Sequence, residues 1–357
     1  MTIIIAEAGV NHNGDSQTAF ELVNVAKKAG ADIVKFQTFK AKNLATNKAE
    51  KAQYQITEKS SEESQLEMLT KLQLPYNLHK DLLKHCEKIG IQFLSTAFDS
   101  ESLKFLVEDL GLDLLKIPSG ELTNTPFVLE HARTGCSLIV STGMASLAEI
   151  EFALGVIAFG YISNQDTMPT SKSFYDAYSS KTGQKALRDK VTLLHCTTEY
   201  PAPLESVNLN VIETLDKAFG LSTGYSDHTE GIAISLAAAA KGATIVEKHF
   251  TLDKGMSGPD HKSSLEPNEL KSMVAGIRAI ELALGSTLKI PTIQEIENKI
   301  AIRKSIVASS NILAGDIFSE ENLGIKRPGS GLSPSEYWRL IGSVSKYNYS
   351  DGDLIID

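Results

Sequence analysis

Residues 221–250 read LSTGYSDHTEGIAISLAAAAKGATIVEKHF. Two short apolar runs, Leu221–Ser226 and Ile245–Phe250, flank a segment whose apolar residues recur at helical spacing. A histidine, His228 or His249, lies at the end of each run. A strand–helix–strand unit of this kind builds a parallel sheet, in which the carboxyl ends of neighbouring strands meet at one edge. We therefore expect the two histidines to lie close together.

The same unit recurs along the chain. The apolar runs are Ile3–Ala6, Ile33–Thr38, Gln92–Phe98, Leu114–Ser119, Leu138–Thr142, Thr192–Thr197, Leu221–Ser226 and Ile245–Phe250. Segments with helical periodicity are Thr18–Lys28, Leu78–Ile89, Glu101–Leu110, Leu147–Ala158, Leu209–Ala218, Ile232–Lys241 and Glu269–Leu284. Strands that alternate with helices in this way predict an α/β fold, a (β/α)8 TIM barrel. An open doubly wound sheet is the alternative, but no glycine-rich nucleotide loop follows the first run.

Length and composition narrow the class of protein. The 357 residues exceed the roughly 250 that a barrel needs, which leaves room for a small module. A net charge of −9 disfavours nucleic-acid binding, because phosphate contacts need a basic surface. Three cysteines without a Cys-x-x-Cys pair indicate a reducing, cytoplasmic setting. The sequence shows neither a signal peptide at its start nor an apolar run long enough to span a membrane, so we expect no membrane partner.

Changes in composition indicate the domain limits. We expect the barrel over residues 1–285, a polar linker over 286–300 and a small β-rich module over 301–357. The polar segment 159–189 is too long for an ordinary barrel loop and is interpreted as an insertion.

Polar residues collect at the carboxyl ends of the apolar runs, where barrel enzymes carry their active sites. They include Glu7, Lys35, Gln37, Thr96, Lys116, Ser119, Glu121, Ser141, Thr198, Tyr200, Ser226 and Glu247. Lys35 and Gln37 share one face of a strand, and polar pairs on an inward face are costly to bury unless they bind something. Two histidines at adjacent strand ends can hold one divalent cation and leave positions open for substrate. This pattern predicts a metal-assisted reaction on an anionic substrate.

Several motifs together resemble the sialic acid synthase family, which includes the legionaminate-type nonulosonate synthases. They are IAEAGVNHNG (5–14), VKFQT (34–38), KIPSGE (116–121), STGM (141–144), HCTTEYP (195–201) and the His/Asp-rich stretch 224–261. The C-terminal module is similar to the antifreeze-like (SAF) domain of these enzymes. The resemblance implies that phosphoenolpyruvate, an N-acyl aminohexose and water give a nine-carbon 2-keto acid and phosphate, with Mn²⁺ or Mg²⁺ as cofactor.

The resemblance also implies roles for individual residues. His228 and His249 match metal ligands, Lys35 and Lys116 match residues that bind phosphoenolpyruvate, and Glu7 and Asp260 match residues that contact the sugar and the reacting water. Glu121 and Glu247 would orient their neighbours, Gln37 and Tyr200 would contact sugar hydroxyls, and the hydroxyls of Thr96, Ser119, Ser141 and Ser226 would bind phosphate. Arg327 would reach into the partner's barrel of a domain-swapped homodimer and bind the N-acyl group.

Some alternatives stay open from the sequence. Several family members have asparagine where this chain has Thr198, which leaves the acceptor open between N-acetylmannosamine and 2,4-diacetamido-2,4,6-trideoxymannose. An acceptor phosphorylated at its 6-position would need further basic residues, of which the sequence shows no cluster. Two further alternatives remain: one of the lysines could form a Schiff base with the substrate, or the protein could be a non-catalytic sugar-binding barrel.

Overall fold

The computed structural model describes residues 1–46, 48–51 and 64–356. Asp357, the last residue of the expected C-terminal module, lies outside these ranges. The chain divides into two compact units, Met1–Gly285 and Ser286–Asp357, which are described separately below.

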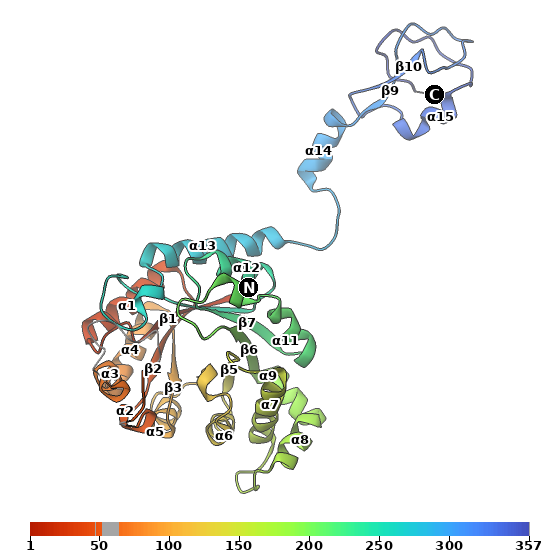
Figure 1. The fold of residues 1–357 in the computed structure, drawn as a ribbon. Coiled ribbons are helices and arrows are strands. Elements are labelled where there is room, and N and C mark those ends of the chain that lie inside the picture. Colours follow the sequence, from red (N-terminus) through yellow and green to blue (C-terminus); the bar gives the residue numbers. More distant parts are fainter. Residues whose placement is uncertain (47, 52–63, 357) are drawn as a thin grey trace. The chain divides into compact units, whose positions relative to one another are not determined.

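The first unit is a closed barrel of eight parallel strands in the order β1 to β8 (Figure 1). The strands are β1 (Ile3–Gly9), β2 (Ile33–Thr38), β3 (Gln92–Ala97), β4 (Leu114–Ile117), β5 (Ser137–Ser141), β6 (Val191–Cys196), β7 (Ser222–Asp227) and β8 (Ile245–His249). Each strand overlaps one of the predicted apolar runs. The prediction of a (β/α)8 barrel is confirmed.

Helices surround the barrel, and each segment predicted from helical periodicity overlaps one of them (Figure 1). They are α1 (Ser16–Ala29), α2 (Ala41–Leu44), α3 (Gln65–Leu72), α4 (Tyr76–Ile89), α5 (Ser100–Lys104), α6 (Thr125–Arg133), α7 (Leu147–Ile162), α8 (Ser171–Ser179), α9 (Lys181–Lys190), α10 (Leu204–Val207), α11 (Val211–Phe219), α12 (Ala233–Ala240) and α13 (Pro267–Leu284), with the short turns η2 (Phe105–Asp109), η3 (Ser119–Glu121) and η4 (His261–Ser263). Helical periodicity did not predict the helices Ala41–Leu44, Gln65–Leu72, Thr125–Arg133, Ser171–Ser179, Lys181–Lys190 and Leu204–Val207. The π-helical turn η2 completes the helix predicted to follow the third strand. The polar segment 159–189 is largely helical, since it contains the end of α7, all of α8 and most of α9.

Local sequence explains where these helices begin and end, as α1 illustrates. The Asp15 side chain accepts a hydrogen bond from the backbone N–H of Thr18, which caps the first turn. Gly30 ends the helix at φ 89°, a left-handed conformation that glycine adopts without a steric penalty.

Inward-facing side chains fill the barrel in layers, because residues two apart on a strand share a face. The layer nearer the amino ends is apolar and contains Ile5, Ile33, Leu94, Leu114, Ile139, Leu194 and Ile245. Two residues further along their strands stand Glu7, Lys35, Thr96, Lys116, Ser141, Cys196, Ser226 and Glu247. A further step of two brings Gln37, Phe98, Thr198, His228 and His249 to the mouth. The apolar layer therefore forms the floor of a polar site.

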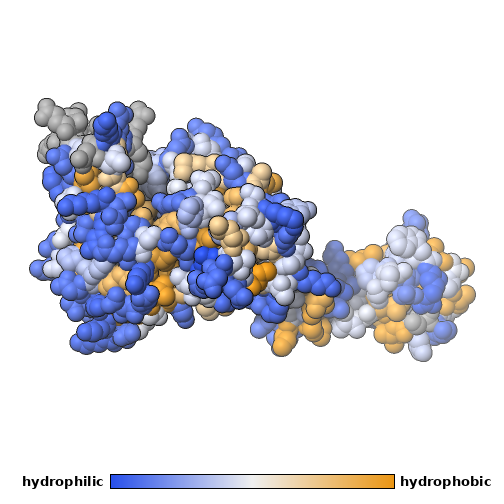
Figure 2. Space-filling model, turned by 90° about the horizontal axis from the view of Figure 1, so that it is seen from below, coloured by the Kyte–Doolittle hydropathy of each residue, from blue (hydrophilic) through white to orange (hydrophobic). Residues whose placement is uncertain are grey.

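The second unit has its own small core. It consists of α14 (Ile293–Ile302), β9 (Ser305–Ala308), β10 (Leu323–Lys326), the turn η5 (Pro334–Glu336) and α15 (Tyr337–Leu340). Strands β9 and β10 pair antiparallel, and Ile306, Ile312, Phe318 and Leu340 pack behind them. Helix α14 begins in the stretch expected to be a polar linker (286–300) and ends at Ile302, and none of its side chains is buried. Figure 2 shows apolar side chains, in orange, on the surface of this unit.

The sequence also leads to predictions about the cysteines and about membrane-spanning segments. Cys86, Cys136 and Cys196 are all free thiols and all buried. In the described ranges, no helix combines the length and the apolar character needed to cross a membrane.

Candidate active site

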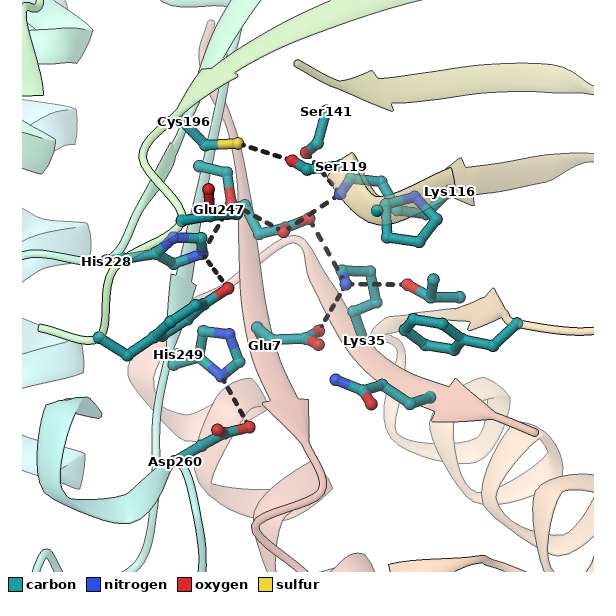
Figure 3. Close-up of a pocket in the computed structure, with 18 of the residues that line it drawn as sticks. Glu7, Lys35, Lys116, Ser119, Ser141, Cys196, His228, Glu247, His249 and Asp260 are labelled. Atoms are coloured by element: carbon teal, nitrogen blue, oxygen red, sulfur yellow. Dashed lines mark hydrogen bonds and ion pairs between the residues drawn. The ribbon is translucent and has the colours of Figure 1, made fainter. Parts of the chain in front are cut away.

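A pocket of about 420 Å³ opens at the carboxyl ends of the strands (Figure 3). Its lining includes Glu7, Lys35, Gln37, Thr96, Lys116, Ser119, Ser141, Thr198, Tyr200, Ser226, His228, Glu247, His249 and Asp260. All eight barrel strands, or the loops that follow them, contribute to this set. Closure of the barrel is what brings together residues that are more than 250 positions apart in the sequence.

Two lysines and two glutamates form the centre of the pocket (Figure 3). The Lys35 ammonium lies 2.9 Å from Glu7 Oε2 and 3.7 Å from Glu247 Oε2. The Lys116 ammonium lies 3.5 Å from Glu247 Oε1. Lys35 also donates to Thr96 Oγ1 at 3.1 Å, and Lys116 donates to Ser141 Oγ at 2.7 Å. Each ammonium is therefore held between a carboxylate and a hydroxyl.

Burial and these neighbours move the pKa values of the two carboxyls in opposite directions. Burial, opposed by the Lys35 ammonium and reinforced by the charge of Glu247, raises the pKa of Glu7 to about 7. Burial acts the same way on Glu247, but the ammonium groups of Lys116 and Lys35 outweigh it and lower the pKa of that carboxyl. Glu247 is thus a permanent anion at neutral pH, whereas Glu7 can gain or lose a proton there.

The two histidines face each other across the ends of β7 and β8. Their ring centroids are 5.7 Å apart, and the Tyr200 ring lies 4.1 Å from that of His228. His228 Nδ1 donates to the Thr197 carbonyl oxygen at 2.5 Å, which leaves Nε2 as the atom with the lone pair. His249 Nδ1 is buried and has no hydrogen-bond partner in the described part of the chain.

The donor set fits a divalent cation held by two imidazoles. Burial lowers the pKa of His228 to about 4. Burial also lowers the pKa of His249 well below its usual value, and the nearby His228 adds to the effect because two protonated rings would repel each other. Both rings are therefore neutral at pH 7, the state in which imidazole binds a metal. Across residues 1–46, 48–51 and 64–356, no group of three or more His, Cys, Asp or Glu side chains is arranged to hold a metal. Water or substrate would have to supply the remaining ligands.

Asp260 reaches the pocket from the loop after β8. Its Oδ2 lies 3.9 Å from His249 Nδ1, and burial raises the pKa of its carboxyl to about 6. Ser264 Oγ donates to the Asp260 carbonyl oxygen at 2.6 Å and also accepts from Asn11 Nδ2 at 2.9 Å. The loop that carries Asp260 is thereby tied to the loop after β1.

Further hydroxyl groups line the pocket. Ser119 Oγ accepts from the Gly143 backbone N–H at 3.0 Å and lies 3.0 Å from Cys196 Sγ. A Cβ on Gly143 would lie 2.8 Å from Ser119 Oγ, so a larger residue there would displace this hydroxyl. Ser226 Oγ donates to Glu247 Oε1 at 3.0 Å. Hydroxyls in this arrangement can turn toward an incoming phosphate or carboxylate.

Two of the predicted site residues are not part of this lining. Glu121 lies in the turn η3, where its Oε2 accepts a hydrogen bond from Asn124 Nδ2 at 2.7 Å. Arg327 belongs to the second unit, where its Nε donates to the Ile302 carbonyl oxygen at 2.9 Å. The roles given to both remain predictions.

Seven lining residues were not among the sequence candidates, and Pro118 and Gly120 are the two that belong to the predicted KIPSGE motif. Of the other five, four are large apolar side chains, Leu44, Leu69, Phe98 and Met144, and one is Cys196. Cys196 and Phe98 stand at inward positions of β6 and just after β3, so strand periodicity identifies them in retrospect. Leu44 and Leu69 come from α2 and α3, and no sequence pattern links those helices to the mouth.

Models of two families match the chain. The model of the NeuB family matches residues 22–289, and that of the SAF domain matches residues 303–355.

Named relatives match almost the full length. The chain is 50% identical over 354 residues to an N,N'-diacetyllegionaminic acid synthase of Campylobacter jejuni, a match that covers 99% of this chain and 98% of that one. It is 42% identical to a synthase of the same name from Legionella pneumophila, with 99% and 93% covered. The crystal structure of an N-acetylneuraminic acid synthetase from Leptospira borgpetersenii superposes with a TM-score of 0.66 at 30% identity, over 83% of this chain and 90% of that one.

Proposed function

The chain belongs to the NeuB family, and we propose that, as a phosphoenolpyruvate-dependent nonulosonate synthase, it condenses phosphoenolpyruvate with open-chain 2,4-diacetamido-2,4,6-trideoxymannose. Water is the third reactant, and the products are N,N'-diacetyllegionaminate and inorganic phosphate. The observation that carries this proposal is the buried Lys35–Glu7 and Lys116–Glu247 cluster beside two neutral histidines.

The two buried lysines are the evidence for an anionic substrate. Lys35 and Lys116 are almost fully buried, and a buried ammonium needs anions around it. Glu7 and Glu247 supply negative charge in the free protein. The phosphate and carboxylate of phosphoenolpyruvate would add charge that the lysines and the hydroxyls of Thr96 and Ser141 can accept.

Glu7 fits the proton transfers of the reaction. The phosphoenolpyruvate methylene carbon bonds to the sugar aldehyde carbon, and the aldehyde oxygen gains a proton. Water then adds to the former enol carbon and loses a proton before phosphate leaves. With its pKa raised to about 7, Glu7 can give or accept a proton near neutral pH, which suits general acid–base catalysis.

His228 and His249 would hold the divalent cation, Mn²⁺ or Mg²⁺. Such a cation, when bound, supplies Lewis-acid polarisation of an aldehyde oxygen. The protein's part is to keep both imidazoles neutral and fixed: His228 is anchored by the Thr197 carbonyl, and His249 is packed against Asp260.

The pocket lining favours a deoxy, doubly acetylated acceptor. Among the described lining residues, Lys35 and Lys116 are the only lysines, no arginine occurs, and both lysines are already paired with carboxylates. A phosphate on the sugar would find no further lysine or arginine among these lining residues. Leu44, Leu69, Phe98 and Met144 instead offer apolar contact to the methyl groups of a 6-deoxy sugar and its acetamido substituents. The names of the two synthase relatives agree with this acceptor.

The active form is proposed to be a domain-swapped homodimer. Ile293, Ile296 and Ile300 lie on one side of α14, and each is more than half exposed. An exposed apolar stripe of this kind fits burial against a second copy of the chain. Arg327 would then bind the N-acyl group in the partner's barrel.

Phosphate release from phosphoenolpyruvate tests the function. The assay uses Mn²⁺ and compares three acceptors: 2,4-diacetamido-2,4,6-trideoxymannose, N-acetylmannosamine and N-acetylmannosamine 6-phosphate. We expect the first acceptor to give the highest kcat/KM, and both EDTA and His249→Ala to abolish turnover. A preference for either other sugar would overturn the proposed acceptor. Absence of release with all three, from protein that binds Mn²⁺, would overturn the synthase assignment.

A further inference from the structure

A fully buried ion pair lies on the outer face of the barrel, directly behind the two histidines. Lys248 Nζ lies 3.1 Å from Asp227 Oδ2, and both side chains are completely excluded from solvent. Asp227 Oδ1 also accepts from the Thr229 backbone N–H and hydroxyl, each at 2.8 Å. Ser235 Oγ on α12 donates to Asp227 Oδ2 at 2.5 Å, and Lys248 donates to the Thr229 carbonyl oxygen at 2.5 Å. The network thus joins β7, β8 and α12.

Each member of the pair is the chain neighbour of a histidine. Asp227 precedes His228, and Lys248 precedes His249. Asp227 and Lys248 are also direct partners in the register of β7 with β8. Successive side chains of a strand point to opposite faces, so the ion pair holds the strands together outside while the histidines project inside.

The pair stands where barrels normally bury apolar residues. The outer faces of barrel strands pack against helices, and at most of these positions this chain has such residues, among them Tyr225 and Val246. A buried ion pair gives little net stability compared with apolar residues of similar size, because both charges lose their hydration. Register, in contrast, is specified strongly by such a pair, since a shift of one residue would separate Asp227 from Lys248 and turn their neighbours to the other face.

We propose that Asp227 and Lys248 are positioning residues that fix the relative placement of His228 and His249 and so set the affinity for the divalent cation. This inference rests on the proposed function, because it takes the two histidines to be the metal ligands. Neither residue is among the pocket-lining side chains, so they would act only through the histidines that follow them.

The test measures metal binding without turnover. Free Mn²⁺ is followed by electron paramagnetic resonance during titration of metal-free protein. We compare the wild type with the double variant Asp227→Asn/Lys248→Met, which removes both charges and keeps similar shapes. We expect the double variant to fold and to bind Mn²⁺ about 10- to 100-fold more weakly, the range found when groups that orient metal ligands are lost. Wild-type affinity in the folded double variant would overturn the inference.

A milder variant covers the case in which the double variant fails to fold. Ser235→Ala removes one hydrogen bond to Asp227 from α12 and leaves the ion pair in place. We expect a smaller loss of Mn²⁺ affinity and an unchanged KM for phosphoenolpyruvate. If Ser235→Ala binds Mn²⁺ as tightly as the wild type while the double variant does not fold, the pair is structural and the inference is wrong.

The ion pair between Arg278 and Asp32 provides a matched control. Arg278 Nη2 lies 2.6 Å from Asp32 Oδ2 at the amino end of β2, away from the pocket. Arg278→Met/Asp32→Asn should lower the unfolding temperature and leave Mn²⁺ affinity unchanged. An equal loss of affinity in this control would mean that general destabilisation explains both results. Failure of the proposed function looks different, because the wild type itself would then bind no Mn²⁺ or release no phosphate.

Discussion

The Lys35 ammonium lies 2.9 Å from the Glu7 carboxylate inside the barrel, and both side chains are at most 4% exposed. Neither charge would be stable there alone, since an unpaired buried ion loses its hydration without compensation. The pair is also unequal: burial raises the pKa of Glu7 to about 7, whereas the carboxylates of Glu247 and Glu7 overcome burial to raise the pKa of Lys35. Lys35 therefore stays charged while Glu7 can exchange a proton.

Lys35→Met should reduce phosphate release strongly. The substitution removes the positive charge that receives the substrate anion and that lies against the proton-exchanging Glu7. Loss of one group that stabilises charge in a transition state costs about 100- to 1000-fold in kcat. Steady-state kinetics with phosphoenolpyruvate varied would measure the loss. Lys80→Met is the control, because Lys80 forms a surface pair with Asp109 and should leave the rate unchanged. A Lys35→Met rate within threefold of the wild type would contradict the role.

A mixing experiment tests the proposed domain swap. In a swapped dimer, each active site combines Lys35 of one chain with Arg327 of the other. Lys35→Met and Arg327→Ala homodimers should both have low activity. In a mixed dimer one site carries both substitutions and the other carries none. Unfolding and refolding an equimolar mixture should therefore restore about a quarter of wild-type activity, if subunits combine at random. Activity no greater than the average of the two variants would contradict the swap.

Much of this site follows from the two-residue period of a strand. Ile5 and Glu7, or Ile245 and Glu247, stand two apart, so a single alternation predicts both an apolar floor and the polar residues above it. The strand limits follow from a different feature: each strand packs on both faces, so its apolar residues form a nearly continuous run.

The remainder depends on contacts that no local pattern encodes. Leu69 reaches the mouth from α3, where amphipathic spacing predicts the helix but not its place beside the pocket. Glu121 follows a strand, as several other predicted site residues do. Its carboxylate instead accepts a hydrogen bond from Asn124 in the adjoining turn, and this local bond competes with an orientation into the barrel. The Asp227–Lys248 pair was hidden because its members belong to different strands and only the register brings them together.

Gly224 should be intolerant of even a methyl group. It occupies the inward position of β7 in the apolar layer, where a Cβ would lie 2.5 Å from the Ile245 carbonyl oxygen and 2.7 Å from Leu194 Cδ2. Overpacking of this kind typically costs about 1–3 kcal/mol. Gly224→Ala should lower the free energy of unfolding by that amount in a denaturant titration. Gly120→Ala is the control, since a Cβ there meets no atom within 4 Å. Equal stability of the two variants would contradict the close packing around Gly224.

Acid should destabilise the barrel partly through His131 on α6. Its Nδ1 donates to the Phe127 carbonyl oxygen at 2.9 Å, and its Nε2 is buried with no hydrogen-bond partner in the described ranges. Burial lowers the pKa of His131 to about 4, against 6.5 for the free side chain. The unfolded chain therefore binds a proton below pH 6.5 that the folded chain refuses until about pH 4. Protonation of His131 therefore does not affect the free energy of unfolding above pH 6.5, where the ring is neutral in both states. The free energy of unfolding decreases as the pH falls from 6.5 to about 4.

His131→Leu should make the unfolding free energy less dependent on pH. Denaturant titrations at pH 7.5 and pH 4.5 would measure the difference for each protein, and each protein's value at pH 7.5 serves as its own control for the change in packing. A pKa difference of this size corresponds to about 3 kcal/mol, so the variant should lose less stability than the wild type by up to that amount. A residual loss should persist in the variant, because burial also lowers the pKa values of His12 and His79. Identical pH dependence in the two proteins would mean that His131 is not the neutral, buried group that its surroundings require.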